Sequence, residues 1–422
     1  MQPSGPELVK TLTLGRGVAL ALGIVIGAGV LVLPGEAYAQ AGDASIYAWL
    51  LDAGLVIPLL WIFSELGARY PSAGGAAGFV RSACGFRLGI LAECLLMGAF
   101  FLGIPAIALS GADYLAALTG LRGWRPDACA ALLIMFVSAM HAFGARVSAT
   151  AQQILSFTLV GVLGFIACVG LFAHPRAGLH VAPFSDWCRS LSVIGMVFFA
   201  YTGWEMISFL GEEFKRPKRD FPLTIALSYV AIIILYIAVV LAVQTDLSAH
   251  DPRTSVAPMA ALLTRVTGPV AADGVAILAV VIIVANLNGA IWAASRLMFA
   301  AAREGTLPRR LAVLSRRGVP WVAVGVCAFV FVAVIGMHRA GLISQSLMFA
   351  LAGQNFLLIY GLCAIAYIRQ SAERWRKVVG FAVGMMSLVV LSSFGWKLVY
   401  PLAIAAAALA VARLRSSTGR VG

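Results

Sequence analysis

Long apolar segments follow one another along the whole chain, and they limit the fold more than any other feature does. In hydrocarbon, each backbone N–H and C=O group has to find a partner within its own segment, so apolar segments of about 20 residues are expected to form transmembrane α-helices. A transmembrane barrel would need short alternating strands, which the sequence lacks. We count twelve apolar segments, with approximate cores at Gly15–Tyr38, Tyr47–Leu66, Leu88–Leu109, Asp127–Phe143, Ser148–Phe172, Leu191–Gly211, Pro222–Val243, Ala271–Ala302, Val319–Ile335, Leu342–Ile368, Val378–Phe394 and Leu398–Ala412.

The composition agrees with an all-α integral membrane protein. Of the 422 residues, 61% are hydrophobic and 12% are charged, and the mean hydropathy is +0.94. A soluble domain averages about 45–50% apolar and about 25% charged residues. So few charges cannot cover a water-soluble protein of this size, which excludes a cytosolic enzyme, a secreted domain and a disordered chain. The seven cysteines form no CxxC pair, and we expect neither a metal nor a cofactor.

The lysines and arginines predict the orientation in the membrane. With the N-terminus inside, 22 of the 31 basic residues fall on the cytoplasmic side and 8 fall outside, while Arg296 lies within the eighth segment. Cytoplasmic connections carry an excess of basic residues. We therefore expect both termini in the cytoplasm and a multi-pass protein of a bacterial-type cytoplasmic (inner) membrane. The net charge of +13 then requires no nucleic-acid partner.

Two of the apolar segments are interrupted by glycine near the middle of the span. In the first, Gly27 and Gly29 flank Ala28, and Pro34 follows. Glycine leaves helical geometry readily, although small residues also form packing faces between membrane helices. The sixth segment is interrupted at Gly203, with a carboxylate at Glu205. Both segments are therefore predicted to be discontinuous helices.

The spacing of the two interruptions predicts an inverted repeat. The sixth helix comes five helices after the first, so a second five-helix unit would start from the opposite side of the membrane. Interruptions at corresponding places in two such units are typical of secondary transporters. We predict repeats at 15–173 and 190–368, two further helices at 369–413, and cytoplasmic termini at 1–14 and 414–422.

An unwound helix offers backbone groups to a ligand. The free N–H groups of the second half-helix carry about half a positive charge and bind a carboxylate without a buried lysine or arginine. The free C=O groups of the first half-helix accept hydrogen bonds from an ammonium group. A site with both kinds of backbone group fits a zwitterion such as an α-amino acid.

Four motifs resemble those of amino acid–polyamine–organocation (APC) transporters. They occur in the family's order, and the resemblance implies a LeuT-like fold with discontinuous helices 1 and 6. Length, the Asn288–Arg296 spacing and the compact C-terminus are most similar to the bacterial exporters of methionine and branched-chain amino acids. The motifs are Ile26-Gly27-Ala28-Gly29-Val30, the stretch 65–75, the stretches 199–205 and 212–222, and the stretches 295–297 and 301–308.

The resemblance implies roles for backbone groups at both interruptions. It assigns the substrate carboxylate to Gly27, Ala28 and Gly29. It assigns the ammonium group to carbonyls near Ile24 and of Phe199 and Ala200.

It also implies roles for side chains. Phe199, Tyr201 and Thr202 would border the pocket and help to gate it. Some relatives carry a proton-linked lysine on helix 5, but the matching stretch 156–160 has none, which argues against lysine-based proton coupling and leaves a sodium site at Ser156 open.

Other polar and aromatic residues inside the spans are candidates for coupling and binding. Burying a carboxylate deep in a membrane span costs free energy, so such a residue usually has a function. We hypothesise that Glu205 carries a proton or acts as a pH-sensitive latch. It could instead satisfy the unwound backbone near Gly203. Trp204 is a candidate gate. Asn286 and Asn288 do not share a helix face, and we expect Asn288 to lie near the substrate.

The sequence thus predicts a secondary active transporter of neutral, apolar L-amino acids (methionine, leucine, isoleucine and valine) that works by alternating access, with H⁺ as a candidate coupling ion. The exporter interpretation depends on the resemblance. A transporter of cationic amino acids or polyamines, or a non-transporting sensor or channel, stays open as an alternative. The motifs HExxH and GxSxG and paired intramembrane aspartates are missing from the sequence, which argues against an enzyme. The expected partners are the amino-acid substrate and membrane lipid.

Overall fold

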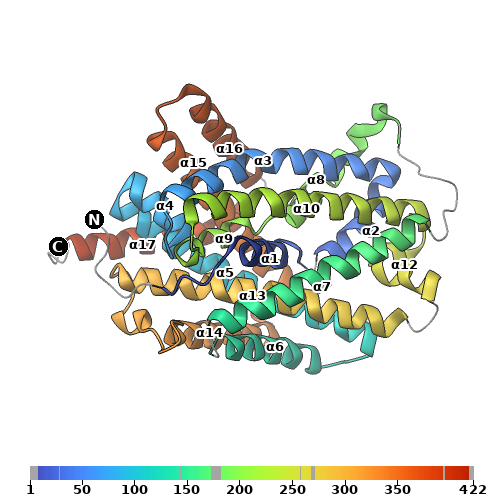
Figure 1. The fold of residues 1–422 in the computed structure, drawn as a ribbon, viewed down its shortest axis with the longest axis horizontal. Helices are drawn as coiled ribbons and strands as arrows, with labels where there is room; N and C mark the ends of the chain where they lie inside the picture. Colours follow the sequence, from blue (N-terminus) through green and yellow to red (C-terminus); the bar gives the residue numbers. More distant parts are fainter. Residues whose placement is uncertain are drawn as a thin grey trace.

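The structure, a computed structural model, describes residues 8–27, 29–142, 145–172, 182–256, 258–267, 271–392 and 395–417. Within these ranges the chain is helical, and its one isolated β-bridge joins Leu12 to Phe214. The long helices run side by side along the long axis of the molecule (Figure 1). The all-α fold class expected from the sequence is confirmed.

The first half of the chain forms one broken helix followed by four long ones. The break lies between α1 and α2, and each remaining apolar segment falls on a single helix. The elements are α1 (Leu14–Val25), α2 (Gly29–Ala41), η1 (Gly42–Ala44), α3 (Ser45–Arg69), α4 (Gly75–Cys84), α5 (Phe86–Thr119), α6 (Arg125–Ala142) and α7 (Ala145–Phe172).

The second half begins with the other broken helix, whose pieces are α8, η3 and α9. Its elements are η2 (Phe184–Ser192), α8 (Ile194–Phe198), η3 (Phe199–Tyr201), α9 (Trp204–Ser208), η4 (Gly211–Glu213), α10 (Pro217–Asp246), α11 (Pro252–Val256), α12 (Pro258–Thr267), α13 (Ala271–Arg303), η6 (Arg309–Ala312), α14 (Trp321–Arg339), α15 (Gln345–Gln370), α16 (Arg374–Ser392), η7 (Gly395–Leu398) and α17 (Val399–Ser417).

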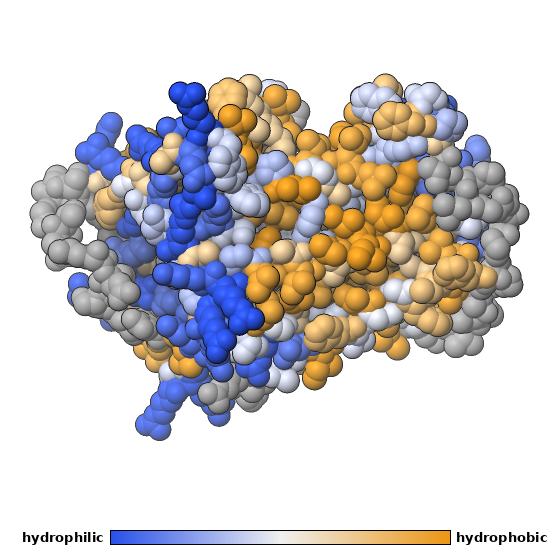
Figure 2. All heavy atoms as spheres, turned by 45° about the horizontal axis from the view of Figure 1, so that its top comes forward, coloured by the Kyte–Doolittle hydropathy of each residue, from blue (hydrophilic) through white to orange (hydrophobic). Residues whose placement is uncertain are grey.

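The surface is that of a multi-pass membrane protein. Large apolar side chains such as Leu132, Phe157 and Phe329 are more than half exposed on the outer helices. Figure 2 shows hydrophobic residues spread over a broad band of the visible face, with hydrophilic residues gathered at one end. By length and composition, eight helical stretches within the described residues could cross a membrane. Three predicted segments lie outside these stretches: the sixth, which is broken, and those of α6 and α17. Of the first segment, only the part from Gly29 onward lies in one of them.

The hydrophilic end is called the basic end below. The helices α3, α13 and α15 finish there, with Arg69, Arg303 and Arg369 in their last turns, and α16 starts there at Arg374.

Helix α1 lies in the middle of the bundle, where it packs against α7, α10 and α13 (Figure 1). A polar cluster fills one of these contacts. The Gln152 side chain donates from Nε2 to Oγ of Ser156 (3.1 Å) and accepts from Nδ2 of Asn288 (2.6 Å). The Ser156 hydroxyl in turn donates to the carbonyl of Ala19 on α1 (2.6 Å). The cluster thereby ties α1 to α7 and α13.

Gly23 makes this close approach possible. A Cβ atom at Gly23 would lie 1.8 Å from Nε2 of Gln152 and 2.7 Å from Oγ of Ser156. Because both atoms are held by hydrogen bonds, we expect Gly23→Ala to destabilise the fold by about 1–3 kcal/mol, a usual cost of overpacking. The measurement is the melting temperature of the purified protein in detergent. Gly164→Ala on α7, where a Cβ meets nothing within 4 Å, is the control; an equal fall in both variants would refute the role of the contact.

Candidate functional site

The first interruption frees backbone groups in the middle of the bundle. Helix α1 ends at Val25, and α2 begins at Gly29. The N–H of Gly27 donates back to the carbonyl of Val25 (2.9 Å), so this segment has already left the helical pattern. Ala28 lies outside the described residues. The last carbonyls of α1 and the first N–H groups of α2 therefore lie where the continuous helical hydrogen-bond pattern is interrupted.

The second interruption lies against the first. Between η3 and α9 the chain turns at Gly203, whose φ of +109° is a conformation that side chains with a Cβ rarely adopt. A Cβ at Gly203 would lie 3.4 Å from Cγ2 and 3.5 Å from the carbonyl oxygen of Ile24. Glycine at this position thus permits both the left-handed turn and close contact between the two breaks.

Both breaks open into one cavity of about 400 Å³. Ile24, Gly27 and Gly29 line it from the first break, and Ala200 and Thr202 line it from the second. The remaining walls come largely from apolar and aromatic residues of α2, α5 and α15, among them Val30, Ile107, Phe349, Gly353, Phe356 and Leu357. The cavity is thus apolar, with polar backbone at the breaks.

Side chains of α10 and α13 hold the carbonyls at the breaks. Nδ2 of Asn286 donates to the carbonyl of Ile24 (2.6 Å). The Tyr236 hydroxyl lies between two carbonyls, those of Val25 (3.3 Å) and Ala200 (3.1 Å). Each carbonyl oxygen has a second lone pair. The carbonyls of Ile24 and Ala200 can therefore accept a further hydrogen bond, for instance from an ammonium group. The carbonyl of Val25 already accepts a second one, from the N–H of Gly27 (2.9 Å).

Glu205 is buried on the cavity wall, at the start of α9. The hydroxyl of Tyr360 on α15 donates to its Oε2 (2.5 Å). Within the described part of the chain, no second side chain reaches the carboxylate. Glu205 therefore links the second break to α15 across the cavity.

Two broken helices around a largely apolar cavity are the arrangement that the four sequence motifs imply. A match to a protein-family model identifies the family. The amino acid permease family model matches residues 12–415. The chain belongs to the amino acid permease family. The likeness to APC transporters read from the motifs is thereby confirmed.

The permease has relatives whose names give different substrates or none. It is 30% identical to the uncharacterized amino acid permease YecA of Bacillus subtilis, over 95% of each chain. It is 27% identical to the L-methionine/branched-chain amino acid exporter YjeH of Escherichia coli, over 94% of each. It is also 28% identical to cationic amino acid transporter 3, mitochondrial, of Arabidopsis thaliana, over 80% of this chain and 60% of the relative.

A solved structure supports the fold. The crystal structure of MhsT in complex with L-phenylalanine aligns with a TM-score of 0.59 at 15% identity, over 93% of the permease and 100% of MhsT. At this identity the likeness is one of fold alone. The expected LeuT-like fold is confirmed.

The structure brings together only part of the set of residues predicted from sequence. Ile24, Gly27, Gly29, Ala200, Thr202 and Glu205 line the cavity. Phe199 contributes backbone to η3, and its side chain, like Ala28, lies outside what the structure describes.

Tyr201 and Trp204 lie behind the cavity wall. The Tyr201 hydroxyl donates to the carbonyl of Trp49 (3.1 Å), and its ring packs edge-on against Trp49 and Tyr236. The buried Trp204 packs against Tyr229. Neither side chain borders the cavity in this conformation, so a gating role for either would require movement.

The choice between the two asparagines of α13 needs correction. Asn286 lines the cavity, whereas Asn288 points away from it and donates to Gln152. Asn286 and Asn288, two positions apart, face different sides of the helix, as expected. The sequence did not reveal which of these sides faces the cavity. Sequence reasoning also missed Tyr236 and Tyr360; a tyrosine within a long apolar segment was the available signal.

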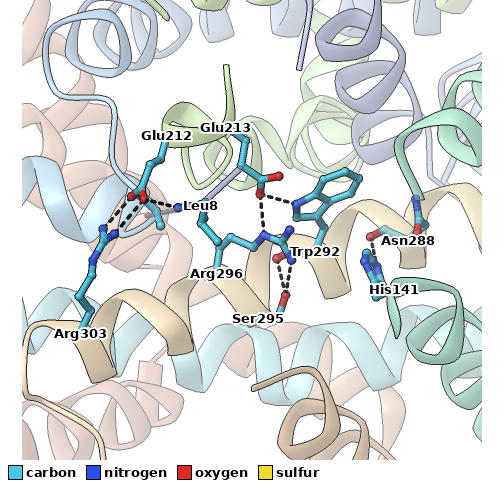
Figure 3. A network of polar contacts seen from close by, with 10 residues as sticks. Leu8, His141, Glu212, Glu213, Asn288, Trp292, Ser295, Arg296 and Arg303 are labelled. Carbon is cyan, nitrogen blue, oxygen red and sulfur yellow. Dashed lines mark hydrogen bonds and ion pairs between the residues drawn. The ribbon is translucent and has the colours of Figure 1, made fainter. Parts of the chain in front are cut away.

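A layer of buried ion pairs follows α9 toward the basic end (Figure 3). Glu212 accepts two hydrogen bonds from the Arg303 guanidinium (2.8 and 2.7 Å) and one each from the N–H groups of Leu8 (3.1 Å) and Ala73 (3.2 Å). These contacts join the N-terminal segment, the turn before α4, η4 and α13.

The neighbouring Glu213 completes this layer. Its Oε1 accepts from Nε of Arg296 (2.6 Å) and from Nε1 of Trp292 (2.7 Å). Its backbone takes part as well, because Leu12 donates to the carbonyl of Glu213 (2.9 Å) and Lys215 donates to that of Leu12 (2.9 Å). The charge of Arg296, which the sequence places within the eighth apolar segment, is thus neutralised by Glu213 in this layer.

The layer sets the ionisation of Glu212. Burial opposes the charged form, but the hydrogen bonds and charge of Arg303 and the N–H groups of Leu8 and Ala73 outweigh it, so the pKa of Glu212 lies below its ordinary value of 4.5. A group whose pKa is lower in the folded state stabilises the fold above its ordinary pKa and loses that contribution as the pH falls through the folded value.

We therefore expect Glu212→Gln to lower stability most at neutral pH. The loss at pH 7 is about 1.5–3 kcal/mol, the range for hydrogen bonds to a charged group, and it shrinks as the pH falls below 4.5. The measurement is the melting temperature of both proteins across that pH range. Glu373→Gln, which removes a half-exposed ion pair with Arg376, is the control and should have little effect. A pH-independent difference would contradict the assignment.

Proposed function

We propose that the permease is a secondary transporter of neutral, apolar L-amino acids such as methionine, leucine, isoleucine and valine. The observation that carries the proposal is the cavity of about 400 Å³ that joins backbone groups of both breaks to largely apolar walls. Its size falls within the range of small-molecule sites, about 300–1,000 Å³. Alternating access would then expose this cavity to each side of the membrane in turn.

Backbone groups at the breaks suit the zwitterionic part of such a substrate. The carbonyls of Ile24, Phe199 and Ala200 are proposed to accept from the ammonium group. The N–H groups of Gly27, Ala28 and Gly29 are proposed to donate to the carboxylate, because α2 starts at Gly29 and the first N–H groups of a helix lack helical partners. The N–H of Gly27 would first have to leave the carbonyl of Val25, to which it donates here (2.9 Å). Phe199 and Thr202 would complete the rim.

The side-chain part of the substrate would meet apolar residues. Val30, Ile107 and Phe356 line the cavity beyond the breaks. The carboxylate of Glu205 already accepts a hydrogen bond from Tyr360. A long cationic side chain would have to compete for Glu205, whereas an aliphatic one or a thioether needs only apolar contact.

Cationic amino acids or polyamines are the second candidate. Glu205 is the one acidic residue on the wall of this cavity among the described residues, and a relative carries the name of a cationic amino acid transporter. If Tyr360 releases Glu205, the carboxylate becomes available to a distal positive charge. This candidate predicts that arginine competes with the transported substrate.

The proposal also includes the orientation of the protein in the membrane and the direction of transport. The basic excess at the end where α3, α13 and α15 finish favours a cytoplasmic location for that end and for both termini, in a bacterial inner membrane. Export is proposed from the likeness to YjeH. The repeats 15–173 and 190–368, followed by helices at 369–413, would move relative to one another, with Tyr201 and Trp204 shifting as the breaks move.

Counterflow in proteoliposomes tests substrate class. Vesicles loaded with unlabelled methionine receive labelled methionine outside, with excess leucine, excess arginine or no competitor, at equal pH on both sides. We expect accumulation that leucine abolishes and arginine leaves unchanged. Competition by arginine alone would favour the second candidate, and no counterflow by folded protein would reject neutral amino-acid exchange.

A variant that fills the cavity tests where the substrate binds. Gly353 of α15 lines the cavity, and a Cβ there meets nothing within 4 Å. We expect Gly353→Leu to fold and to reduce methionine counterflow at least about tenfold. One extra methylene in an apolar pocket already changes the free energy of recognition by about 1–3 kcal/mol. Gly325→Leu on the exposed face of α14, where a Cβ also meets nothing, is the matched control. Unchanged counterflow in Gly353→Leu would place the substrate elsewhere.

Glu205→Gln tests proton coupling. The amide keeps the shape of the side chain and a hydrogen-bond acceptor for Tyr360, but it cannot gain or lose the proton of a carboxyl group. We expect the variant to keep counterflow at equal pH and to lose acceleration by a pH gradient. Glu373→Gln, at the exposed α15–α16 turn, should keep both. A full pH-gradient response in Glu205→Gln would overturn the role of Glu205 as proton carrier.

A further inference from the structure

A second cavity, of about 300 Å³, lies between α15 and α16. Its lining is apolar apart from Ser387 and comes from only these two helices. Ile365 is 47% exposed, Phe381 65% and Leu388 62%, so the cavity is a groove that opens on the outer face of the bundle. Both helices have the length and composition of membrane spans. The groove therefore faces lipid hydrocarbon.

Glycine shapes this groove. Near its end toward the α15–α16 turn the helices touch, because a Cβ at Gly380 would lie 2.5 Å from Cγ1 of Ile368. Farther along, a Cβ at Gly384 would lie 3.9 Å from Cβ of Ala364, and one at Gly361 would meet nothing within 4 Å. The space at Gly361 is thus free because that residue has no side chain, and it is large enough for part of an alkyl chain.

Two basic residues stand at the end of the groove nearest the basic end. Arg369 follows the lining residue Ile365 by four positions on α15, and Lys377 precedes the lining residue Phe381 by four positions on α16. Residues four apart share a helix face. Arg369 and Lys377 therefore extend the two groove-lining faces by one turn, and both are exposed.

The acidic residue of this turn is engaged elsewhere. Glu373 pairs with Arg376 (3.4 Å) and accepts from Nε1 of Trp375. Arg376 also reaches Glu65 on α3 (3.3 Å), and Trp375 packs against Trp61 of the same helix. That side of the turn is thus tied to α3. Arg369 and Lys377 form no ion pair with any residue that the structure describes.

We propose that this groove binds one anionic phospholipid. An acyl chain lies between α15 and α16 along Gly361, and the phosphate of the headgroup lies between Arg369 and Lys377. An apolar groove that ends in two uncompensated cations matches an amphiphile with a negative head, and basic sites between membrane helices bind such headgroups. A second copy of this chain fits less well, because a symmetric contact would bring a second Arg369 and Lys377 to the same place.

Native mass spectrometry of the detergent-solubilised protein tests the site. The probes are phosphatidylglycerol and phosphatidylethanolamine with identical acyl chains, titrated separately. We expect wild-type protein to retain one phosphatidylglycerol in preference to phosphatidylethanolamine. The double variant Arg369→Gln/Lys377→Gln should bind phosphatidylglycerol about thirtyfold more weakly, the ratio expected for two headgroup charges, with phosphatidylethanolamine binding unchanged. Gly361→Leu should weaken both lipids by filling the groove.

Matched controls separate this site from general charge and general apolar surface. Arg309→Gln/Arg310→Gln removes two other exposed basic residues near the basic end, in η6, and Gly325→Leu adds the same side chain to an exposed face of α14. Both should bind lipid as the wild type does, and melting temperatures establish that each variant is folded. Should Gly361→Leu fail to fold, the charge variants decide.

Three results would overturn the proposal. Equal retention of the two lipids by the wild type would remove the preference for an anionic head. Equal losses in the Arg369/Lys377 and Arg309/Arg310 variants would show a diffuse charge effect. Separation of a dimer into monomers by Gly361→Leu, with lipid binding unchanged, would show that a second copy occupies the groove.

Discussion

Hydrogen bonds to the carbonyls at the two breaks are the interactions on which the rest of this structure depends. A membrane helix that unwinds exposes backbone groups that hydrocarbon cannot satisfy. Here Asn286 donates to the carbonyl of Ile24, and the hydroxyl of Tyr236 lies within hydrogen-bonding distance of the carbonyls of Val25 and Ala200. The supporting side chains come from α13 and α10, the helices against which α1 packs. The breaks are therefore tolerable only inside this bundle, and the cavity exists because they are tolerated.

The sequence predicted the helices and the interruptions but not their partners. Apolar segments of membrane-spanning length determine where helices form, and glycines at Gly27, Gly29 and Gly203 mark where two of them unwind. Those signals are local. The choice of Asn286 over Asn288, and the approach of Tyr360 to Glu205, depend on how α13 and α15 are rotated about their axes. Packing between distant helices determines that rotation, and a single sequence does not report it.

The two glutamates of η4 neutralise two arginines of α13. Arg296 and Glu213 neutralise one another at 2.6 Å inside the bundle, and Arg303 with Glu212 repeats the arrangement nearer the surface. The sequence showed Arg296 as a cation within a span but gave no partner for it, because 83 residues separate it from Glu213. By contrast, Arg369 and Lys377 lie at the edge of the bundle, where lipid headgroups rather than side chains supply the opposite charge.

The contact between Leu8 and Glu212 has a consequence for the order of assembly. The two residues are 204 positions apart, and the arginine that completes the pairing, Arg303, is synthesised later still. A ribosome makes the segment around Leu8 before any of the apolar segments, yet this segment cannot take its final place until eight of the twelve have been made. A segment that is made before all twelve apolar segments is therefore among the last to be held in place.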